Sequence, residues 1–294
     1  MNRSGEGFAP SSDGTRIFYE SAGEGDAVVL CDGIACDGFI WKYLRPELLP
    51  HYRVIHWNYR GHGRSGAPAD SSRVGVDDHA RDLHAVLDAL GVKRAALISH
   101  SMGTQVSLEA YRQRPEAIAG MALMCGSYGH ITRTFHGTDV MLYAIPWAQA
   151  LLERYPGVMR ALWSRSPAKL AAMVAKVLGE VDALRIQTED LLPYFDHFTH
   201  LDPGMFFRML TAAGVHTAED ILTSVEAPTL VVAAERDTFT PVRYAEQMAR
   251  QIPGAELLFV ARGSHTAPIE QPEVINPKVM DFLARRVRWE PSRG

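Results

Sequence analysis

The sequence is poor in cysteine, and it lacks both a long apolar run and an excess of basic charge. Three cysteines occur among 294 residues, an odd number that does not provide the disulfide framework of a secreted domain. No run of about 18 apolar residues is present to span a membrane, and the first residues, MNRSGEGFAPSSDG, lack the apolar core of a signal peptide. We therefore expect a cytoplasmic protein without a membrane partner.

The basic residues are scattered and the net charge is −4, so no positive stripe is available to follow a nucleic-acid backbone. The 12 histidines include no H-x-x-x-H or H-E-x-x-H pattern supported by a carboxylate. Cys31 and Cys36 are close in sequence, but nothing near them would activate a thiol, and burial is the favoured interpretation. We expect no nucleic-acid partner, no metal and no cofactor.

Apolar runs alternate with helix-compatible segments before residue 125 and again after residue 226. The Asp13-Gly14 dipeptide predicts a hairpin, and continuous apolar runs are typical of strands buried on both faces of a parallel sheet. The predicted strands cover residues 16–20, 27–31, 53–59, 95–98, 118–125, 229–234 and 256–261, and the predicted helices 39–49, 77–91, 242–252 and 274–286. This alternation predicts an α/β fold.

The alternation stops between residues 128 and 224, where only helical patterns occur. Prolines that are expected to end helices divide this stretch, at Pro146, Pro156, Pro167, Pro193 and Pro203. The simplest organisation is a core domain of residues 1–127 and 225–294, with an all-helical cap inserted at residues 128–224. A hydrophobic content of 47% is enough to build such a core.

A candidate nucleophile lies where a predicted strand turns sharply into a helix. Residues 95–103 read AALISHSMG, and the small residues Ser99 and Gly103 stand two positions on either side of Ser101. A turn this tight needs small flanking residues and lifts the central hydroxyl clear of the sheet. The backbone N–H of Met102 lies at the start of the following helix, where donors are unpaired.

A serine nucleophile needs a base and a group that orients the base. His265 follows the last predicted strand and Asp237 follows strand 229–234, so both are expected at the carboxyl edge of the sheet, beside Ser101. Glu235 and Asp26 are alternatives for the acid on composition alone. Asp237 is favoured because Glu235 is still close to the strand register.

The chain order Ser101, Asp237, His265 is the nucleophile–acid–base order of the α/β-hydrolases. Together with the motifs DGIACDG, NYRGHGRSG, SHSMG, ERDTFTP and GSH, it makes residues 13–125 and 226–287 resemble that superfamily. The sequence is most similar to the esterase and cofactor-free haloperoxidase branch. The resemblance implies a mostly parallel eight-stranded sheet covered by helices, with a helical lid between the sixth and seventh strands.

Two positions depart from the pattern of that family. Ser99 stands where most relatives have glycine, and Asp32-Gly33 replaces a His-Gly pair. The resemblance implies that the backbone N–H of Ile34, with that of Met102, holds the oxyanion. A charged carboxylate at residue 32 would oppose the oxyanion. We expect Asp32 to turn away, to accept hydrogen bonds from loop N–H groups or pair with Arg60 or Arg64, or else to stay protonated through burial.

A serine at the turn indicates acyl transfer, whereas an aspartate would indicate an epoxide hydrolase or a dehalogenase. We predict a serine hydrolase that cleaves esters or lactones of small to medium apolar substrates through an acyl-enzyme. Among the apolar cap residues, those expected to line a pocket over Ser101 are Phe135, Tyr143, Trp147 and Phe206. The alternatives are perhydrolysis by the same triad, as in the haloperoxidases, and a non-catalytic small-molecule receptor. A homodimer is left open.

Overall fold

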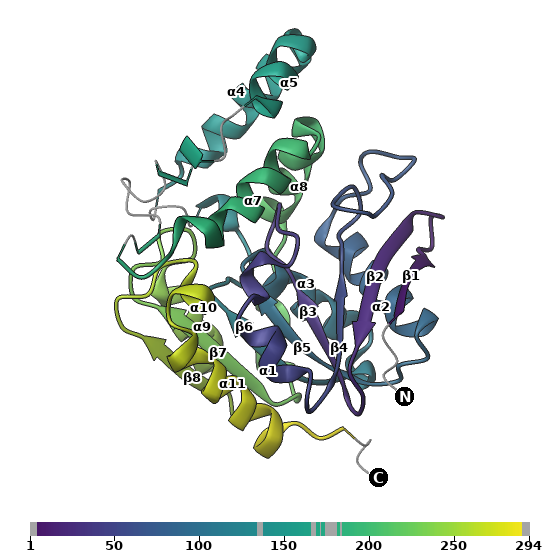
Figure 1. Cartoon of the computed structure of the whole chain (residues 1–294), viewed down its shortest axis with the longest axis vertical. Helices are drawn as coiled ribbons and strands as arrows, with labels where there is room; N and C mark the ends of the chain where they lie inside the picture. Colours follow the sequence, from purple (N-terminus) through teal and green to yellow (C-terminus); the bar gives the residue numbers. More distant parts are fainter. Residues whose placement is uncertain are drawn as a thin grey trace.

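The computed structural model describes residues 5–133, 138–165, 169–170, 172–173, 181–182 and 184–289. Phe135 and Pro167 lie outside these ranges. The strands in this part of the chain form one eight-stranded sheet in the order β1-β2-β4-β3-β5-β6-β7-β8 (Figure 1). Their bounds are β1 Gly5–Pro10, β2 Arg16–Ala22, β3 Ala27–Cys31, β4 Arg53–Trp57, β5 Ala95–His100, β6 Ile118–Met124, β7 Thr229–Ala234 and β8 Glu256–Val260.

The sheet is antiparallel at one end and parallel elsewhere. β1 and β2 form a hairpin, and β2 pairs antiparallel with β4, while the remaining neighbours pair in parallel. In the hairpin turn Gly14 has a φ of 83°, and the Thr15 N–H donates to Asp13 Oδ1 at 3.0 Å. The predicted hairpin and the mostly parallel sheet are confirmed, and the carboxyl ends of β5, β7 and β8 meet at one edge.

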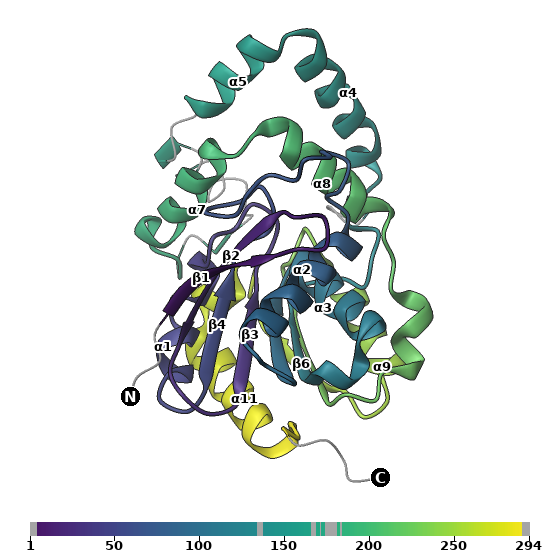
Figure 2. The same ribbon diagram turned by 90° about the vertical axis from the view of Figure 1, so that its right-hand side faces the viewer.

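Helices cover both faces of the parallel strands (Figures 1 and 2), which explains why β3, β5, β6 and β7 are buried along their whole length. Val29 of β3 packs into the apolar cluster on one face, and Val28 and Leu30 pack into the cluster on the other. The helices on the first face are α2 Val76–Ala89, α3 Met102–Gln113 and α9 Val242–Gln251, and those on the second are α1 Leu44–Leu48 and α11 Pro272–Arg286.

The predicted helix over residues 39–49 is divided in the structure. A short 3-10 helix, η1, spans Phe39–Trp41, and α1 begins only at Leu44. Pro46 accounts for the division, because a proline ring collides with the carbonyl group four residues earlier and prevents one helix from running through residue 42.

The chain between β6 and β7 forms a helical insertion above the carboxyl edge of the sheet (Figure 2). Its helices are η3 Ile131–Arg133, α4 Val140–Arg154, α5 Pro156–Ser164, α7 Thr188–His200, α8 Pro203–Val215 and η5 Glu219–Ser224. An isolated bridge between Gly129 and Thr217 joins the two ends of the insertion. Helices α4 and α5 project farther from the sheet than α7 and α8 (Figures 1 and 2). The domain boundaries at residues 128 and 224 stay a prediction.

The prolines of the insertion act in two different ways. Pro156 and Pro203 begin α5 and α8, where a missing N–H costs nothing. Pro146 and Pro193 lie inside α4 and α7, so the prediction that these two prolines break helices is wrong. Each removes one backbone donor, while the hydrogen bonds of the flanking turns continue the helix. Within the described ranges, no helix combines the length and apolar character that crossing a membrane requires.

Candidate active site

The turn between β5 and α3 holds Ser101 in a strained conformation. Its φ is 55° and its ψ −122°, a region that residues other than glycine rarely occupy. The chain is crowded around this turn. A Cβ added to Gly103 would lie 2.3 Å from the carbonyl oxygen of Cys31, so a residue with a side chain does not fit there. The Ser99 hydroxyl is buried and donates to the Ala122 carbonyl oxygen at 3.2 Å. Small residues at 99 and 103 therefore permit the turn that the sequence predicts.

Ser101, His265 and Asp237 form a continuous hydrogen-bonded chain at the carboxyl edge of the sheet. His265 Nε2 lies 3.0 Å from Ser101 Oγ, and His265 Nδ1 lies 3.0 and 2.9 Å from the two carboxylate oxygens of Asp237. A carboxylate only accepts hydrogen bonds, so the Nδ1 proton points to Asp237 and Nε2 is left to accept the Ser101 proton. The structure thus brings together the three residues that were predicted from loops after β5, β7 and β8.

Asp237 is held by its own loop. The N–H groups of Phe239 and Thr240 donate to Oδ1 at 2.9 and 2.7 Å, and the Thr240 hydroxyl donates to Oδ2 at 2.7 Å. Its side chain is 1% exposed. Glu235, the alternative acid, instead accepts the Arg262 N–H at 2.6 Å, and Asp26 precedes β3 at the opposite edge of the sheet. Neither alternative reaches His265.

The loop after β3 lies directly against Ser101. A Cβ added to Gly33 would be 3.1 Å from the Cβ of Ser101, and Ala35 reverses the chain with a φ of 59°. In the described part of the chain, no hydrogen-bond acceptor is found for the backbone N–H of Ile34 or of Met102. These are the two predicted oxyanion donors, and Ile34 faces the cavity that contains Ser101.

Asp32 turns away from this cavity into a buried network of donors. It accepts the Gly38 N–H at 2.9 Å, the Trp41 indole N–H at 2.6 Å and His56 Nε2–H at 2.8 Å. The expectation that loop N–H groups bind Asp32 is confirmed. The arginine partners are wrong, because Arg60 binds Asp82 and Asp13, and Arg64 binds Glu6. The loop after β4 carries both arginines away from Asp32.

His56 is the cation that faces Asp32. Burial alone would lower its pKa, but the charge and hydrogen bond of Asp32, with Glu20 on the other side of the ring, raise the pKa of His56 to about 10. Sequence reasoning missed this partner. The signal was the pairing of β3 with β4, which sets Leu30 beside His56 and brings the imidazole to the end of β3.

A cavity of about 260 Å³ opens above Ser101 and His265. The wall on the side of the insertion consists of Val181, Leu191, Tyr194 and Phe195, most of them from α7. The remaining lining residues are Gly33, Ile34, Cys36, Phe39, His100, Ser101, Phe239, His265 and Thr266. Apolar side chains dominate, and no lysine, arginine or carboxylate is among them.

Three of the four cap residues predicted to line the pocket, Tyr143, Trp147 and Phe206, lie elsewhere. Tyr143 and Trp147 are 78% and 66% exposed on α4, because this helix packs on α8 and leaves one face to solvent. Phe206 belongs to an aromatic cluster with Trp163, 5.5 Å away between ring centroids, and with Phe198, 5.1 Å away. Phe135 lies outside the described residues. Helical periodicity marked these side chains as apolar but did not indicate which helix covers the nucleophile.

Comparison with known proteins connects this geometry to a family. Residues 26–272 match the family model described as alpha/beta hydrolase fold. The chain belongs to the α/β-hydrolase family. It is 30% identical over 279 residues to a protein named putative carbamate hydrolase RutD from Variovorax paradoxus, a match that covers 92% of this chain and 96% of that relative.

Two solved structures are also similar to this chain. Est816, described as an N-acyl homoserine lactone degrading enzyme, is 29% identical with a TM-score of 0.73, and the match covers 94% of this chain and 99% of that one. A thermophilic esterase from Thermogutta terrifontis is 22% identical with a TM-score of 0.78, and the match covers 97% and 100% of the two chains. The second likeness is evidence for the fold alone.

The loop that carries the histidine of this α/β-hydrolase is fixed by a buried carboxylate. Glu270, at the end of α10 Ala267–Glu270, accepts the Ser264 N–H at 2.9 Å, the Thr266 hydroxyl at 2.8 Å and the Asp182 N–H at 2.8 Å, and also the Ser264 hydroxyl. Ser264 and Thr266 flank His265. Sequence reasoning missed Glu270, whose only signal is a single acidic residue in the segment TAPIEQP.

His100 supports the same loop from β5. Its Nε2–H donates to the His265 carbonyl oxygen at 2.8 Å. Burial, and then the positive charge that His265 can carry, lower the pKa of His100 to about 3. His100 is therefore neutral at physiological pH and holds His265 without competing for its proton.

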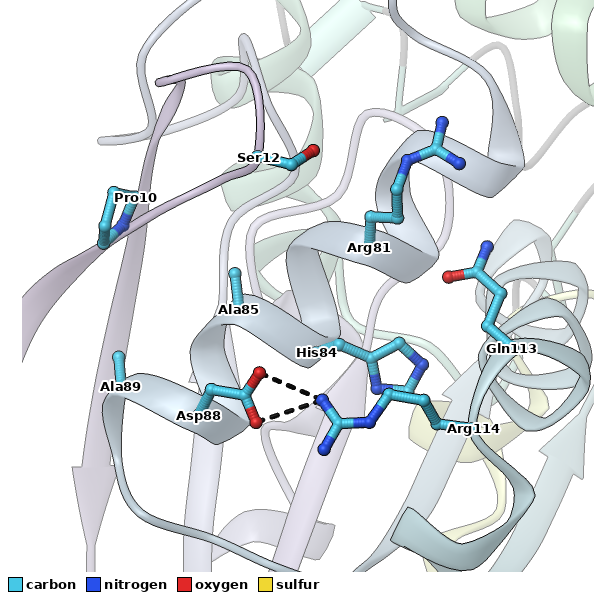
Figure 3. A pocket seen from close by; sticks show the side chains of 9 residues that line it. All are labelled: Pro10, Ser12, Arg81, His84, Ala85, Asp88, Ala89, Gln113 and Arg114. Carbon is cyan, nitrogen blue, oxygen red and sulfur yellow. Dashed lines mark hydrogen bonds and ion pairs between the residues drawn. The ribbon is translucent and has the colours of Figure 1, made fainter.

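A larger hollow of about 550 Å³ lies between the hairpin and helices α2 and α3 (Figure 3). It is lined by residues near the end of α3, such as Gln113, whereas Ser101 precedes the first turn of that helix. Its charged groups already have partners, since Arg114 Nη1 lies 3.0 Å from both carboxylate oxygens of Asp88 and Arg81 binds Asp77 and Asp78 at 2.8 Å. Among the described residues, no three His, Cys, Asp or Glu side chains are arranged to hold a metal ion. The chemistry therefore concentrates around Ser101.

Proposed function

We propose that this α/β-hydrolase cleaves neutral carboxylic esters, including lactones, with Ser101 as nucleophile. The observation that carries the proposal is the hydrogen-bonded chain from Ser101 through His265 to Asp237 at the floor of an apolar cavity. A serine hydroxyl paired with a histidine that a buried carboxylate orients is the arrangement that activates serine for acyl transfer.

In the proposed reaction, His265 Nε2 takes the Ser101 proton as Oγ attacks the carbonyl carbon. The oxyanion forms between the N–H groups of Ile34 and Met102, which have no acceptor in the described structure. His265 then protonates the leaving alkoxide, and an acyl-enzyme remains on Ser101. Water, deprotonated by His265, attacks the acyl carbon, releases the carboxylic acid and restores the serine.

The cavity supports a neutral substrate of modest size. Its volume of about 260 Å³ is near the lower end for small-molecule sites, and none of the described residues that line it is a lysine or arginine that would bind a carboxylate or phosphate. The likeness to Est816, described as degrading N-acyl homoserine lactones, supports including cyclic esters in the substrate class.

A fluorophosphonate probe, which reacts with activated serines, tests the proposal directly. We expect stoichiometric labelling of the wild type and hydrolysis of p-nitrophenyl esters with neutral acyl chains. Ser101→Ala should abolish labelling and lower kcat at least about a thousandfold, since the nucleophile is lost. Its fold should persist, because a smaller side chain at φ 55° adds no strain. Labelling that survives in the alanine variant would refute the assignment of the nucleophile.

A further inference from the structure

One hydroxyl group interrupts the apolar wall that α7 presents to the cavity. Tyr194 lines the cavity with Leu191 and Phe195, and its ring packs among aromatic neighbours, with centroids 5.1 Å from Phe39 and 5.2 Å from Phe195. Within the described residues, the Tyr194 hydroxyl has no hydrogen-bond partner. Tyr194 is only partly buried, and its hydroxyl is not among the fully enclosed polar atoms without a partner, so it stays accessible to a substrate in the cavity. A phenylalanine, as at the adjacent position 195, would keep the aromatic packing but would lack this donor.

Tyr194 lines the same cavity as Ile34 and Cys36 of the loop after β3. Burial raises the pKa of Tyr194, so its hydroxyl stays protonated and can donate a hydrogen bond. Cys36 in turn is close to the nucleophile: a Cβ added to Gly33 would lie 3.3 Å from Cys36 Sγ and 3.1 Å from Ser101 Cβ. Tyr194 therefore shares one cavity with Ser101, the proposed nucleophile.

Among the described residues, the other polar side chains of the cavity wall are either engaged or enclosed. Thr266 Oγ1 donates to Glu270, His265 binds Ser101 and Asp237, and the Cys36 thiol donates to the Ile34 carbonyl oxygen at 3.5 Å. His100 Nδ1 also lacks a partner, but it is fully enclosed by protein and could not reach a ligand without rearrangement. On the α7 side of the described cavity wall, the Tyr194 hydroxyl is thus the side-chain donor that can bind a substrate.

We propose that Tyr194 donates a hydrogen bond to a second oxygen of the substrate, a few bonds from the scissile carbonyl group. The preferred substrates are then neutral esters or lactones with an ether, keto or amide oxygen in the acyl chain, rather than plain alkyl esters. A carboxylate at that place is disfavoured because the described lining of the cavity contains no lysine or arginine. This inference rests on the proposed ester hydrolysis and makes Tyr194 a specificity-determining residue.

Two substrates of equal length test the proposed hydrogen bond from Tyr194. They are p-nitrophenyl hexanoate and the same ester with an oxygen in place of the fourth acyl carbon. In Tyr194→Phe, kcat/KM for the ether ester should fall roughly 5- to 20-fold, the effect of losing one hydrogen bond to a neutral acceptor. For the hexanoate, kcat/KM should change less than about twofold. Comparing each ester between the two proteins cancels the difference in intrinsic reactivity. Tyr155→Phe is the matched control, since Tyr155 is 54% exposed beside α5.

The possible results distinguish the proposed role of Tyr194 from other roles of this residue. An equal loss on both esters would overturn the inference and indicate that Tyr194 acts on the reacting carbonyl group or positions α7. Unchanged discrimination between the two esters would overturn it as well. Fluorophosphonate labelling of Tyr194→Phe at the wild-type rate verifies that the site is intact. If wild type neither reacts with the probe nor cleaves either ester, the proposed function itself fails, and the inference fails with it.

Discussion

At the scale of single residues, the charge of Asp32 is the feature that most needs compensation. It stands two positions before Ile34, whose N–H is a proposed oxyanion donor, and it is 2% exposed. The structure compensates this charge with the imidazole of His56, at 2.8 Å, and with two neutral donors from residues 38 and 41. Because these donors lie on the side away from the cavity, the negative charge is satisfied before a substrate binds.

The ion pair between His56 and Asp32 should make the free energy of unfolding fall as the pH becomes alkaline. The pKa of His56 is about 10 in the folded protein, above its ordinary value of 6.5. Its contribution is therefore fully present below pH 6.5 and is lost as the pH rises through 10. We expect His56→Gln to lower the free energy of unfolding by a few kcal/mol at pH 6, and the difference from wild type to shrink by pH 10.

Urea unfolding at several pH values between 6 and 10 measures this difference. His51→Gln, a change of an exposed histidine five residues earlier, is the matched control and should follow the wild-type curve. If the difference in the free energy of unfolding between wild type and His56→Gln stays constant from pH 6 to pH 10, the assignment of His56 as the cation of Asp32 is contradicted.

The sequence predicts residues of the site well where a motif fixes the backbone. Ser101, Asp237 and His265 each follow directly from the end of a strand, so their positions depend only on the parallel sheet. The partner of Asp32 could not be predicted in the same way. Arg60 and Arg64 are closer to the strand end in sequence, but the loop that carries them turns toward α2 and β1, and only the register of β3 against β4 identifies His56.

At the scale of elements, the short helix α10 connects the loop that carries His265 with the insertion. Glu270 at the end of α10 binds both residues that flank His265, and the same carboxylate accepts the N–H of Asp182, next to the cavity residue Val181. The loop of the base and one part of the insertion thus depend on one buried side chain.

Glu270→Gln should therefore lower kcat while leaving KM nearly unchanged. The amide keeps one acceptor oxygen and sets an NH₂ group either against the Ser264 N–H, in place of Oε2, or against the donors of Thr266 and Asp182, in place of Oε1, and the displaced loop misaligns His265. Small displacements of a base cost roughly 10- to 100-fold in rate. Steady-state kinetics on one neutral ester measure the effect. Glu273→Gln is the control because its side chain is 63% exposed and binds only Arg185 at 3.4 Å. Equal kcat values for the two variants would refute this role.

The insertion shows where prediction from helical periodicity ends. The pattern identified helices between β6 and β7 and gave their apolar character. It could not show that α7 lies over Ser101 while α4 projects outward, because the tertiary contacts of both helices involve residues far away in sequence. Asp190 of α7, for example, accepts hydrogen bonds from Lys42 and from Tyr43, which lies 3.3 Å away. The cavity wall is therefore formed by Leu191, Tyr194 and Phe195 rather than by Tyr143 and Trp147.

At the scale of the whole molecule, Arg60 joins three parts of the core. Its side chain is 0% exposed and donates to Asp82 of α2 at 2.6 and 2.7 Å, to Asp13 of the hairpin turn at 2.9 Å, and to the Arg73 carbonyl oxygen at 2.8 Å. Removing one partner of a buried ion pair leaves an uncompensated charge, which is costly.

We expect Arg60→Met to lower the free energy of unfolding by about 3–5 kcal/mol. The folded fraction should keep its kcat, since Arg60 contacts no residue of the cavity. Arg64→Met offers a matched control in the same loop: its ion pair with Glu6 is more than half exposed on both sides and should contribute less than about 1 kcal/mol. Chemical unfolding of the two variants side by side measures the contrast, and similar losses would contradict it.

The insertion also separates the proposed nucleophile from its base in the order of synthesis. Ser101 and His265 are 164 positions apart in sequence and stand on opposite sides of the helical insertion. A ribosome that adds about 5–20 residues per second therefore exposes the serine roughly 8 to 30 s before the histidine is made. β7 and β8, which carry the acid and the base, can pair with the sheet only after the insertion has been completed. The proposed triad can therefore form only when nearly the whole chain has been made, and a chain that ends before β8 would lack the proposed base.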